Sequence, residues 1–124
     1  MTETNRPLSP HLQIYRPQIT TVLSITHRMT GAGLAFGAVV AAWWLLSIVY
    51  GPDAYTTFYH FAKSFVGRFM LFGFLWALTY HFLNGLRHLV WDTGRGIDMP
   101  SASRSGWAVV GGSVVLTGFF WVLA

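Results

Sequence analysis

The sequence of 124 residues contains no cysteine. Disulfide bonds, thiol redox chemistry and thiolate metal sites are therefore excluded, and any metal must be held by histidine or carboxylate. Charge is also scarce, because charged residues make up 10% of the chain, against about 25% in an average soluble domain. Hydrophobic residues make up 53%. This composition is typical of a membrane protein.

Three stretches have no Asp, Glu, Lys or Arg: residues 29–52, 69–86 and 105–124. As helices rising ~1.5 Å per residue they would measure roughly 36, 27 and 30 Å, close to the ~30 Å hydrocarbon core of a bilayer. A large soluble protein can also bury such helices, but a chain this short cannot bury three of them. The sequence predicts an all-α membrane protein in which one membrane-anchor domain covers residues 1–124. The transmembrane helices are expected at about 22–50, 64–91 and 104–124.

The placement of basic residues predicts the orientation. Six of the eight Lys and Arg residues precede the first stretch or separate the second from the third: Arg6, Arg16, Arg28, Arg87, Arg95 and Arg104. By the positive-inside rule, the N-terminal segment 1–20 and the 87–104 loop face the cytoplasm, and the 51–68 loop lies outside. Basic residues spread over two short segments favour contact with anionic lipid head groups, and they exclude a nucleic-acid interface.

The N-terminal segment is expected to be irregular. Pro7, Pro10 and Pro17 each remove an amide donor and bias the preceding residue away from helix. The first helix should then begin near Thr20 or Thr21, where a threonine can cap free amides. The first 13 residues, MTETNRPLSPHLQ, contain neither the apolar core of a signal peptide nor the pattern of a mitochondrial presequence. This favours a bacterial plasma membrane over the mitochondrial inner membrane.

Polar residues mark one face of the first helix where it enters the membrane. Ser24, His27, Arg28 and Gly31 are spaced at i, i+3, i+4 and i+7 and share that face. Ionisable groups inside a membrane usually mark sites, so the face should point inward or toward a partner. The alternative is that Arg28 only extends to lipid phosphates as an anchor.

The second helix carries a histidine within a column of small residues. Gly73, Ala77, His81 and Gly85 follow one another at i+4 steps, which predicts a groove beside the imidazole. Either another helix packs in this groove and hydrogen-bonds His81, or a flat macrocycle occupies it with His81 on its iron. Periodicity leaves both possibilities open.

The depth of His81 bears on that choice. It lies six residues before Arg87, so about 9 Å inside the cytoplasmic edge of its helix. No other histidine is expected at this depth: His27 and His88 fall near the membrane edge, and His11 and His60 lie outside the spans. A haem with two histidine ligands would therefore need a partner chain to supply the second ligand.

Two sequence blocks resemble a known family. They read RPLSPH followed by S-x-x-H-R-x-T-G, and H-x-x-x-G-L-R-H-L-x-W-D. Both resemble the signature blocks of the cytochrome b subunit of succinate dehydrogenase, its large membrane anchor, and with the three-span layout the resemblance covers nearly the whole chain. The third span carries no motif beyond its apolarity.

The resemblance implies roles for specific residues. His81 would be an axial ligand of haem b, and the small membrane-anchor subunit would supply the opposite ligand. Ser24 and Arg28 would line the ubiquinone pocket, while His27 and Arg28 would lie near the haem propionates. The remaining partners would be an iron-sulfur subunit and a flavoprotein subunit that oxidises succinate. Two alternatives remain open: a fumarate reductase anchor working in reverse, and a structural anchor without haem.

Overall fold

The computed structural model describes residues 7–124, and this part of the chain is helical throughout its regular structure. Helix α1 covers Ile19–Tyr50, α2 covers Pro52–Lys63, α3 covers Phe65–Asp92 and α4 covers Met99–Leu123. Helices α1, α3 and α4 are each long and apolar enough to cross a membrane. The predicted all-α fold with three spans is confirmed.

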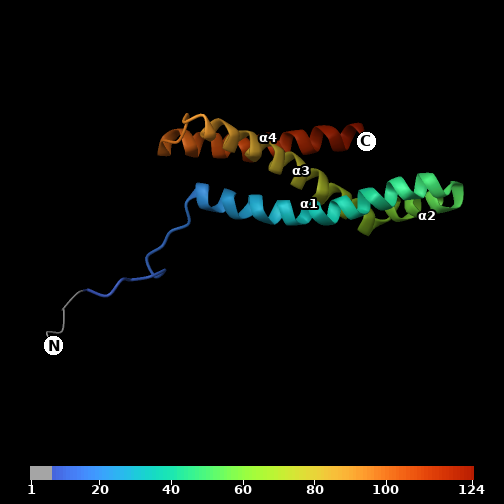
Figure 1. The fold of residues 1–124 in the computed structure, drawn as a ribbon, viewed down its shortest axis with the longest axis horizontal. Coiled ribbons are helices and arrows are strands. Elements are labelled where there is room, and N and C mark those ends of the chain that lie inside the picture. The colour runs from blue at the N-terminus through green and yellow to red at the C-terminus, as the bar shows by residue number, and fades with distance from the viewer. Residues whose placement is uncertain (1–6) are drawn as a thin grey trace.

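Helix α3 lies between α1 and α4, and α2 runs back beside the far end of α1 (Figure 1). The small core forms where the three long helices meet, around Leu23, Tyr80 and Val109. The Tyr80 hydroxyl donates a hydrogen bond of 2.8 Å to the Leu23 carbonyl oxygen. This bond satisfies the one polar atom of Tyr80 inside an apolar contact, so it ties α3 to α1 close to the histidines.

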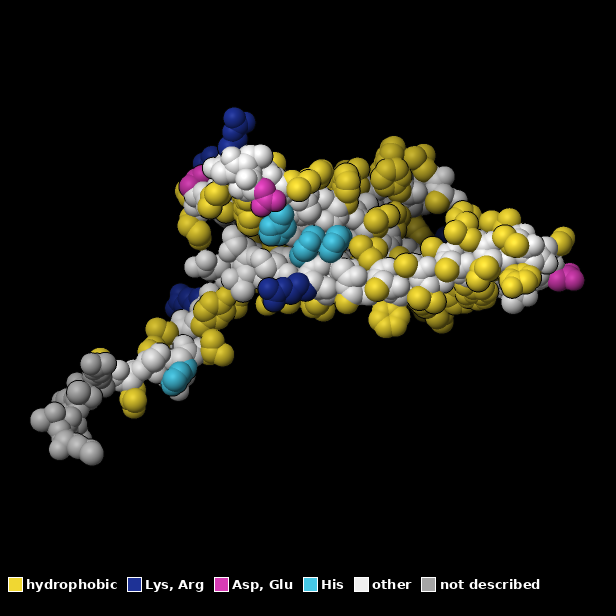
Figure 2. Space-filling model, viewed as in Figure 1, with side chains coloured by type: hydrophobic (Ala, Val, Ile, Leu, Met, Phe, Trp, Pro, Cys, Tyr) yellow, Lys and Arg dark blue, Asp and Glu magenta, His cyan; other side chains and the backbone are white. Residues whose placement is uncertain are grey.

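Large apolar side chains point outward from the helices rather than into a core. Phe36, Val49, Phe69 and Val122 are among the many that are exposed, and apolar side chains cover the outer faces in the space-filling view (Figure 2). Between helices, by contrast, the buried positions are largely small or polar. Such contacts are typical of membrane helices, because lipid is as apolar as the side chains facing it.

The segment between the first two spans contains a helix that the sequence reading treated as a loop. Gly51 turns the chain with a φ of 101°, and α2 begins at the next residue, Pro52. Asp53 lies in the first turn and Lys63 in the last. This charge placement suits the helix dipole, and proline is well tolerated at a helix start. These signals were present in the sequence but lie in a stretch too short to span a membrane.

The starts of α1 and α4 also differ from the expected positions. The predicted threonine cap is wrong: the N-cap of α1 is Gln18, which makes no side-chain capping bond. Residues 7–18 are irregular, as predicted, apart from one turn. Helix α4 begins at Met99, five residues before the expected 104, because Asp98 caps it and accepts a hydrogen bond from the Ser101 amide. Hydrogen bonding from Ser101 also holds the pKa of the Asp98 carboxyl below its usual range.

Candidate functional site

Three histidines gather where α1 crosses α3. The imidazole rings of His27 and His81 stack with their centroids 3.8 Å apart and their planes within 7°. His88 lies 5.4 Å from His27 in a tilted arrangement. Histidine side chains form one cluster between the helices in Figure 2. The expectation that no other histidine shares the depth of His81 is therefore wrong. Counting residues from each helix end ignores how the helices cross, and the crossing brings His27 to the level of His81.

Hydrogen bonds fix the orientation of the His81 imidazole. Its Nδ1 lies 3.1 Å from the His27 carbonyl oxygen and 3.2 Å from the Thr30 hydroxyl. A carbonyl oxygen only accepts, so Nδ1 carries the proton and donates it. The lone pair is then on Nε2, for which no residue in the range 7–124 provides a hydrogen-bond partner. A histidine held by its Nδ1–H in this way has the usual arrangement of a metal ligand that binds through Nε2.

Helix α1 leaves room for this imidazole at Gly31. A Cβ placed there would lie 3.1 Å from Cε1 of His81, closer than ordinary contact. A groove of about 660 Å³ continues between α1 and α3, and its lining includes Thr30, Gly73 and Ala77. Two of the small residues on the N-terminal side of His81, Gly73 and Ala77, thus line a groove, but His81 itself is not part of its lining. Gly85 has only open space where a Cβ would be.

Ser24 and Arg28 are less closely tied to the histidines. The Ser24 side chain is half-buried, and its hydroxyl donates to the Thr20 carbonyl oxygen at 3.0 Å. Arg28 is exposed. The structure therefore brings two of the four residues of the predicted polar face, His27 and Gly31, against His81. It leaves Ser24 hydrogen-bonded within its own helix and Arg28 open to a ligand or partner.

The sequence reading missed the burial of Arg87. It treated this residue as a charge of the cytoplasmic loop, but Arg87 lies within α3 and is only 6% exposed. Its guanidinium donates to the Ser105 hydroxyl at 2.9 Å, to the Asn84 side-chain oxygen at 3.2 Å and to the Ala102 carbonyl oxygen at 2.9 Å. It also stacks 4.0 Å from the Trp91 ring. The spacing of Asn84, Arg87 and Trp91 on one helix face was the signal that could have revealed it.

Two buried polar atoms of the described residues have no hydrogen-bond partner: His27 Nδ1 and Asn84 Nδ2. Within residues 7–124, no three His, Asp or Glu side chains are arranged to hold a metal ion by themselves. His11 and His60 lie away from the cluster, in the N-terminal segment and on α2. The site therefore offers one oriented imidazole, that of His81.

Comparison with known proteins identifies the family. A family model for the succinate dehydrogenase/fumarate reductase transmembrane subunit matches residues 2–120. The chain belongs to this family. It is 46% identical over 112 residues to the succinate dehydrogenase cytochrome b556 subunit of Paracoccus denitrificans, an alignment that covers 90% of this chain and 86% of that protein.

Other members of the family agree. The cytochrome b556 subunit of Rickettsia typhi is 42% identical over 117 residues, covering 94% of this chain and 91% of that protein. The mitochondrial cytochrome b560 subunit of Mus musculus is 38% identical over 125 residues, covering 94% of this chain and 70% of that protein. The resemblance inferred from the two sequence blocks is confirmed. The chain is a multi-pass membrane subunit of bacterial type that belongs to succinate dehydrogenase, and it is no complete enzyme by itself.

Proposed function

We propose that this chain is the cytochrome b anchor of a succinate:ubiquinone oxidoreductase, in which His81 holds the iron of haem b and Ser24 and Arg28 help to build the ubiquinone-reduction site. The orientation of His81 carries the proposal, because Nδ1 is committed to the His27 carbonyl oxygen and Nε2 is left with a lone pair. When bound, the haem supplies one-electron redox chemistry. The relatives, which are named cytochrome b556 subunits, support the same assignment.

The second axial ligand would come from a partner. Axial ligands approach the iron from opposite faces of the macrocycle. The ring of His27 instead lies parallel to that of His81 with 3.8 Å between centroids, which leaves no room for a metal between them. His27 is therefore excluded as the second ligand, which supports the proposal that the small membrane-anchor subunit supplies it. Its other partners would be the iron-sulfur subunit, which delivers electrons, and the flavoprotein subunit, which oxidises succinate.

Arg28 and Ser24 would act on the quinone through charge and hydrogen bonding. An arginine guanidinium is positively charged at physiological pH, and its planar fork can hold a haem propionate along one edge and reach the quinone with another. It would stabilise the negative charge that develops on the quinone oxygen during reduction. The Ser24 hydroxyl would rotate from the Thr20 carbonyl oxygen to donate to a quinone carbonyl. The exposure of Arg28 leaves it free for such contacts.

Replacing His81 tests the haem assignment. In the purified complex, His81→Ala should abolish or severely perturb the absorption band of the dithionite-reduced b-type haem. His60→Ala is the matched control, because His60 is exposed on α2 and away from the histidine cluster. An unchanged reduced spectrum in the His81 variant would refute the assignment. Absence of any haem band from the wild-type complex would instead favour a structural anchor.

The direction of the reaction separates succinate oxidation from the fumarate reductase alternative. The family description covers both enzymes, whereas the relatives described above are named succinate dehydrogenase. The purified complex should reduce ubiquinone with succinate faster than it reduces fumarate with a low-potential quinol. The opposite ratio would reassign the chain to a fumarate reductase.

The proposed site also requires a defined topology, with the histidine end of the bundle at the cytoplasmic face. Thr56→Cys, on exposed α2, should react with an impermeant thiol reagent in intact cells, and Thr93→Cys, in the exposed turn after α3, should not. Both residues are exposed, so burial does not distinguish them. Labelling of the Thr93 variant alone would show that the chain has the opposite orientation in the membrane.

A further inference from the structure

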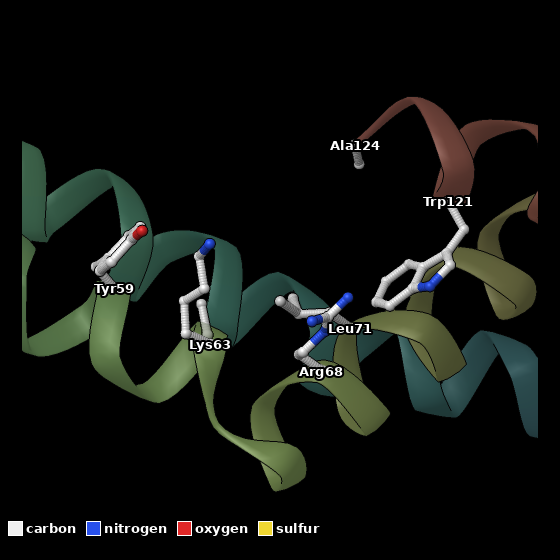
Figure 3. Close-up of a pocket in the computed structure, with 7 residues that line it drawn as sticks. Tyr59, Lys63, Arg68, Leu71, Trp121 and Ala124 are labelled. Carbon is white, nitrogen blue, oxygen red and sulfur yellow. The ribbon is translucent and has the colours of Figure 1, made fainter.

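A second pocket lies at the end of the bundle opposite the histidines. It has a volume of about 240 Å³ and opens between the end of α2, the start of α3 and the end of α4. Figure 3 shows side chains from these three helices converging on it, with Arg68 pointing toward Trp121 and Lys63 toward the same open side. Its lining is Tyr59, Ala62, Lys63, Arg68, Leu71, Trp121 and Ala124.

The pocket is positively charged. Lys63 and Arg68 are five residues apart but lie on different helices, because Ser64 ends α2 and caps the start of α3. Lys63 Nζ lies 5.2 Å from the centroid of the Tyr59 ring, and Arg68 Cζ lies 5.8 Å from that of Trp121. No Asp or Glu side chain is part of the lining. The two cations therefore face the same space with aromatic rings, and not carboxylates, beside them.

The pocket also lies at the depth of lipid head groups. Arg68 is in the first turn of α3, and the uncharged stretch of that helix begins at the next residue, Phe69. Tyrosine and tryptophan, here Tyr59 and Trp121, are characteristic of the membrane interface. Below Arg68 the lining becomes apolar at Leu71. Phe72, the next residue, lies outside the lining and packs edge-on against Trp121 with 5.2 Å between the ring centroids.

We propose that this pocket binds an anionic phospholipid, with its phosphate held between Lys63 and Arg68 and an acyl chain along the apolar wall that begins at Leu71. A phosphate at the hydrocarbon edge supplies a negative charge that no side chain of the lining provides. The apolar wall favours a lipid over free inorganic phosphate, which would leave that wall uncovered. This assignment is independent of the haem and quinone roles proposed for the opposite end.

Lipid selectivity of the assembled complex tests the proposal. Phosphatidylglycerol added to the detergent-purified complex should bind more tightly than phosphatidylcholine, as measured by native mass spectrometry and by the shift in melting temperature. Because a Lys or Arg near a membrane surface attracts the lipid phosphate, removing one of the two should weaken the preference for phosphatidylglycerol about fivefold. Lys63→Gln and Arg68→Gln together should weaken it roughly 25-fold. Arg95→Gln is the matched control, because Arg95 is an exposed cation in the turn between α3 and α4. The control should keep the wild-type preference.

A preference for phosphatidylglycerol that survives in the double variant would overturn the site. If inorganic phosphate alone raised the melting temperature as much as phosphatidylglycerol does, the lipid would be ruled out as the occupant of the pocket. A second measurement uses the wild-type complex and so does not depend on whether a variant complex assembles. A phosphatidylglycerol analogue with a photoreactive head group should label the wild-type complex within residues 59–71 more strongly than the matching phosphatidylcholine analogue. Equal labelling by the two analogues would also overturn the proposal.

Discussion

Polar groups on the two faces of α3 differ in how completely they are hydrogen-bonded. Toward α4, the Thr79 hydroxyl lies 2.8 Å from that of Thr117, and the Arg87 guanidinium has three hydrogen-bond acceptors and an aromatic ring. Toward α1, His81 has a partner on Nδ1 only, and the buried Nδ1 of His27 has none. Both faces hold two helices together through polar groups, since Tyr80 bonds Leu23 on the α1 side, but only the α1 side leaves imidazole nitrogens without partners.

This difference supports the proposal that the polar residues toward α4 are structural and those toward α1 functional, without reference to any ligand. Buried polar groups normally find partners, because an unsatisfied one costs free energy. The α3–α4 contact satisfies nearly all of its groups, with Asn84 Nδ2 as the exception. The α1–α3 contact leaves the buried Nδ1 of His27 without a partner and gives the His81 imidazole a partner on Nδ1 only. Burial alone does not reveal this difference, since Arg87 is buried and His81 only half-buried.

The largest expected effect is on stability, at the α4 face. Arg87→Ala removes three hydrogen bonds and leaves the Asn84 side-chain oxygen without its donor, whereas the Ala102 carbonyl oxygen keeps the Ser105 hydroxyl. It should lower the free energy of unfolding by roughly 3 kcal/mol or more, since hydrogen bonds to charged groups contribute about 1.5–3 kcal/mol each. Thermal unfolding of the purified complex measures this. Arg104→Ala, at an exposed position on α4, should change little. Equal stability of the two variants would show that the α4 face is no more structural than the surface.

The next effect concerns activity, at the α1 face. Arg28→Lys keeps the charge but loses the planar fork, and Ser24→Ala loses a hydroxyl. Each should slow ubiquinone reduction by an amount on the order of 1–3 kcal/mol in transition-state free energy. Succinate oxidation by a water-soluble acceptor should persist, because that chemistry takes place in a partner. Haem content and subunit ratio must be measured in the same preparations. Wild-type ubiquinone reduction in both variants would return Arg28 to the role of a lipid anchor.

A smaller effect is expected from the space that holds the imidazole. Gly31→Ala would place a Cβ 3.1 Å from Cε1 of His81, so the ring must move by a few tenths of an ångström. The reduced haem spectrum should shift, or haem occupancy should fall, while the complex still assembles. Gly33→Ala is the matched control, because nothing lies within 4 Å of a Cβ built there. Identical spectra from the two variants would mean that His81 does not hold the haem in this position.

The smallest effect returns to the α4 face. Thr79→Val replaces the hydroxyl that contacts Thr117 with a methyl group of similar size. Hydrogen bonds between membrane helices average about 0.6 kcal/mol, so the loss in unfolding free energy should be close to that value and the haem spectrum should be unchanged. Thr56→Val, on exposed α2, serves as the control in the same unfolding assay. A changed haem spectrum in the Thr79 variant would show that the α4 face also affects the haem, and would contradict the proposed difference between the two faces.

Much of this protein could be predicted from its sequence. Uncharged stretches of membrane-spanning length determine three helices, because a lipid environment requires apolar side chains and internally bonded backbone. The i+4 column of Gly73, Ala77, His81 and Gly85 predicted a groove, and Gly73 and Ala77 line one, because helical periodicity fixes which residues share a face. The two signature blocks led to the family that the comparisons confirm.

Only the tertiary structure decided which faces meet and at what level. The stacking of His27 on His81, the burial of Arg87 against α4 and the convergence of Lys63 and Arg68 with Trp121 each join residues of different helices. Periodicity along one helix assigns a residue to a face, but it carries no information about the angle and offset at which a neighbouring helix crosses that face. Those two quantities depend on the packing of all the side chains at the contact, and they set the partners of every polar group between the helices.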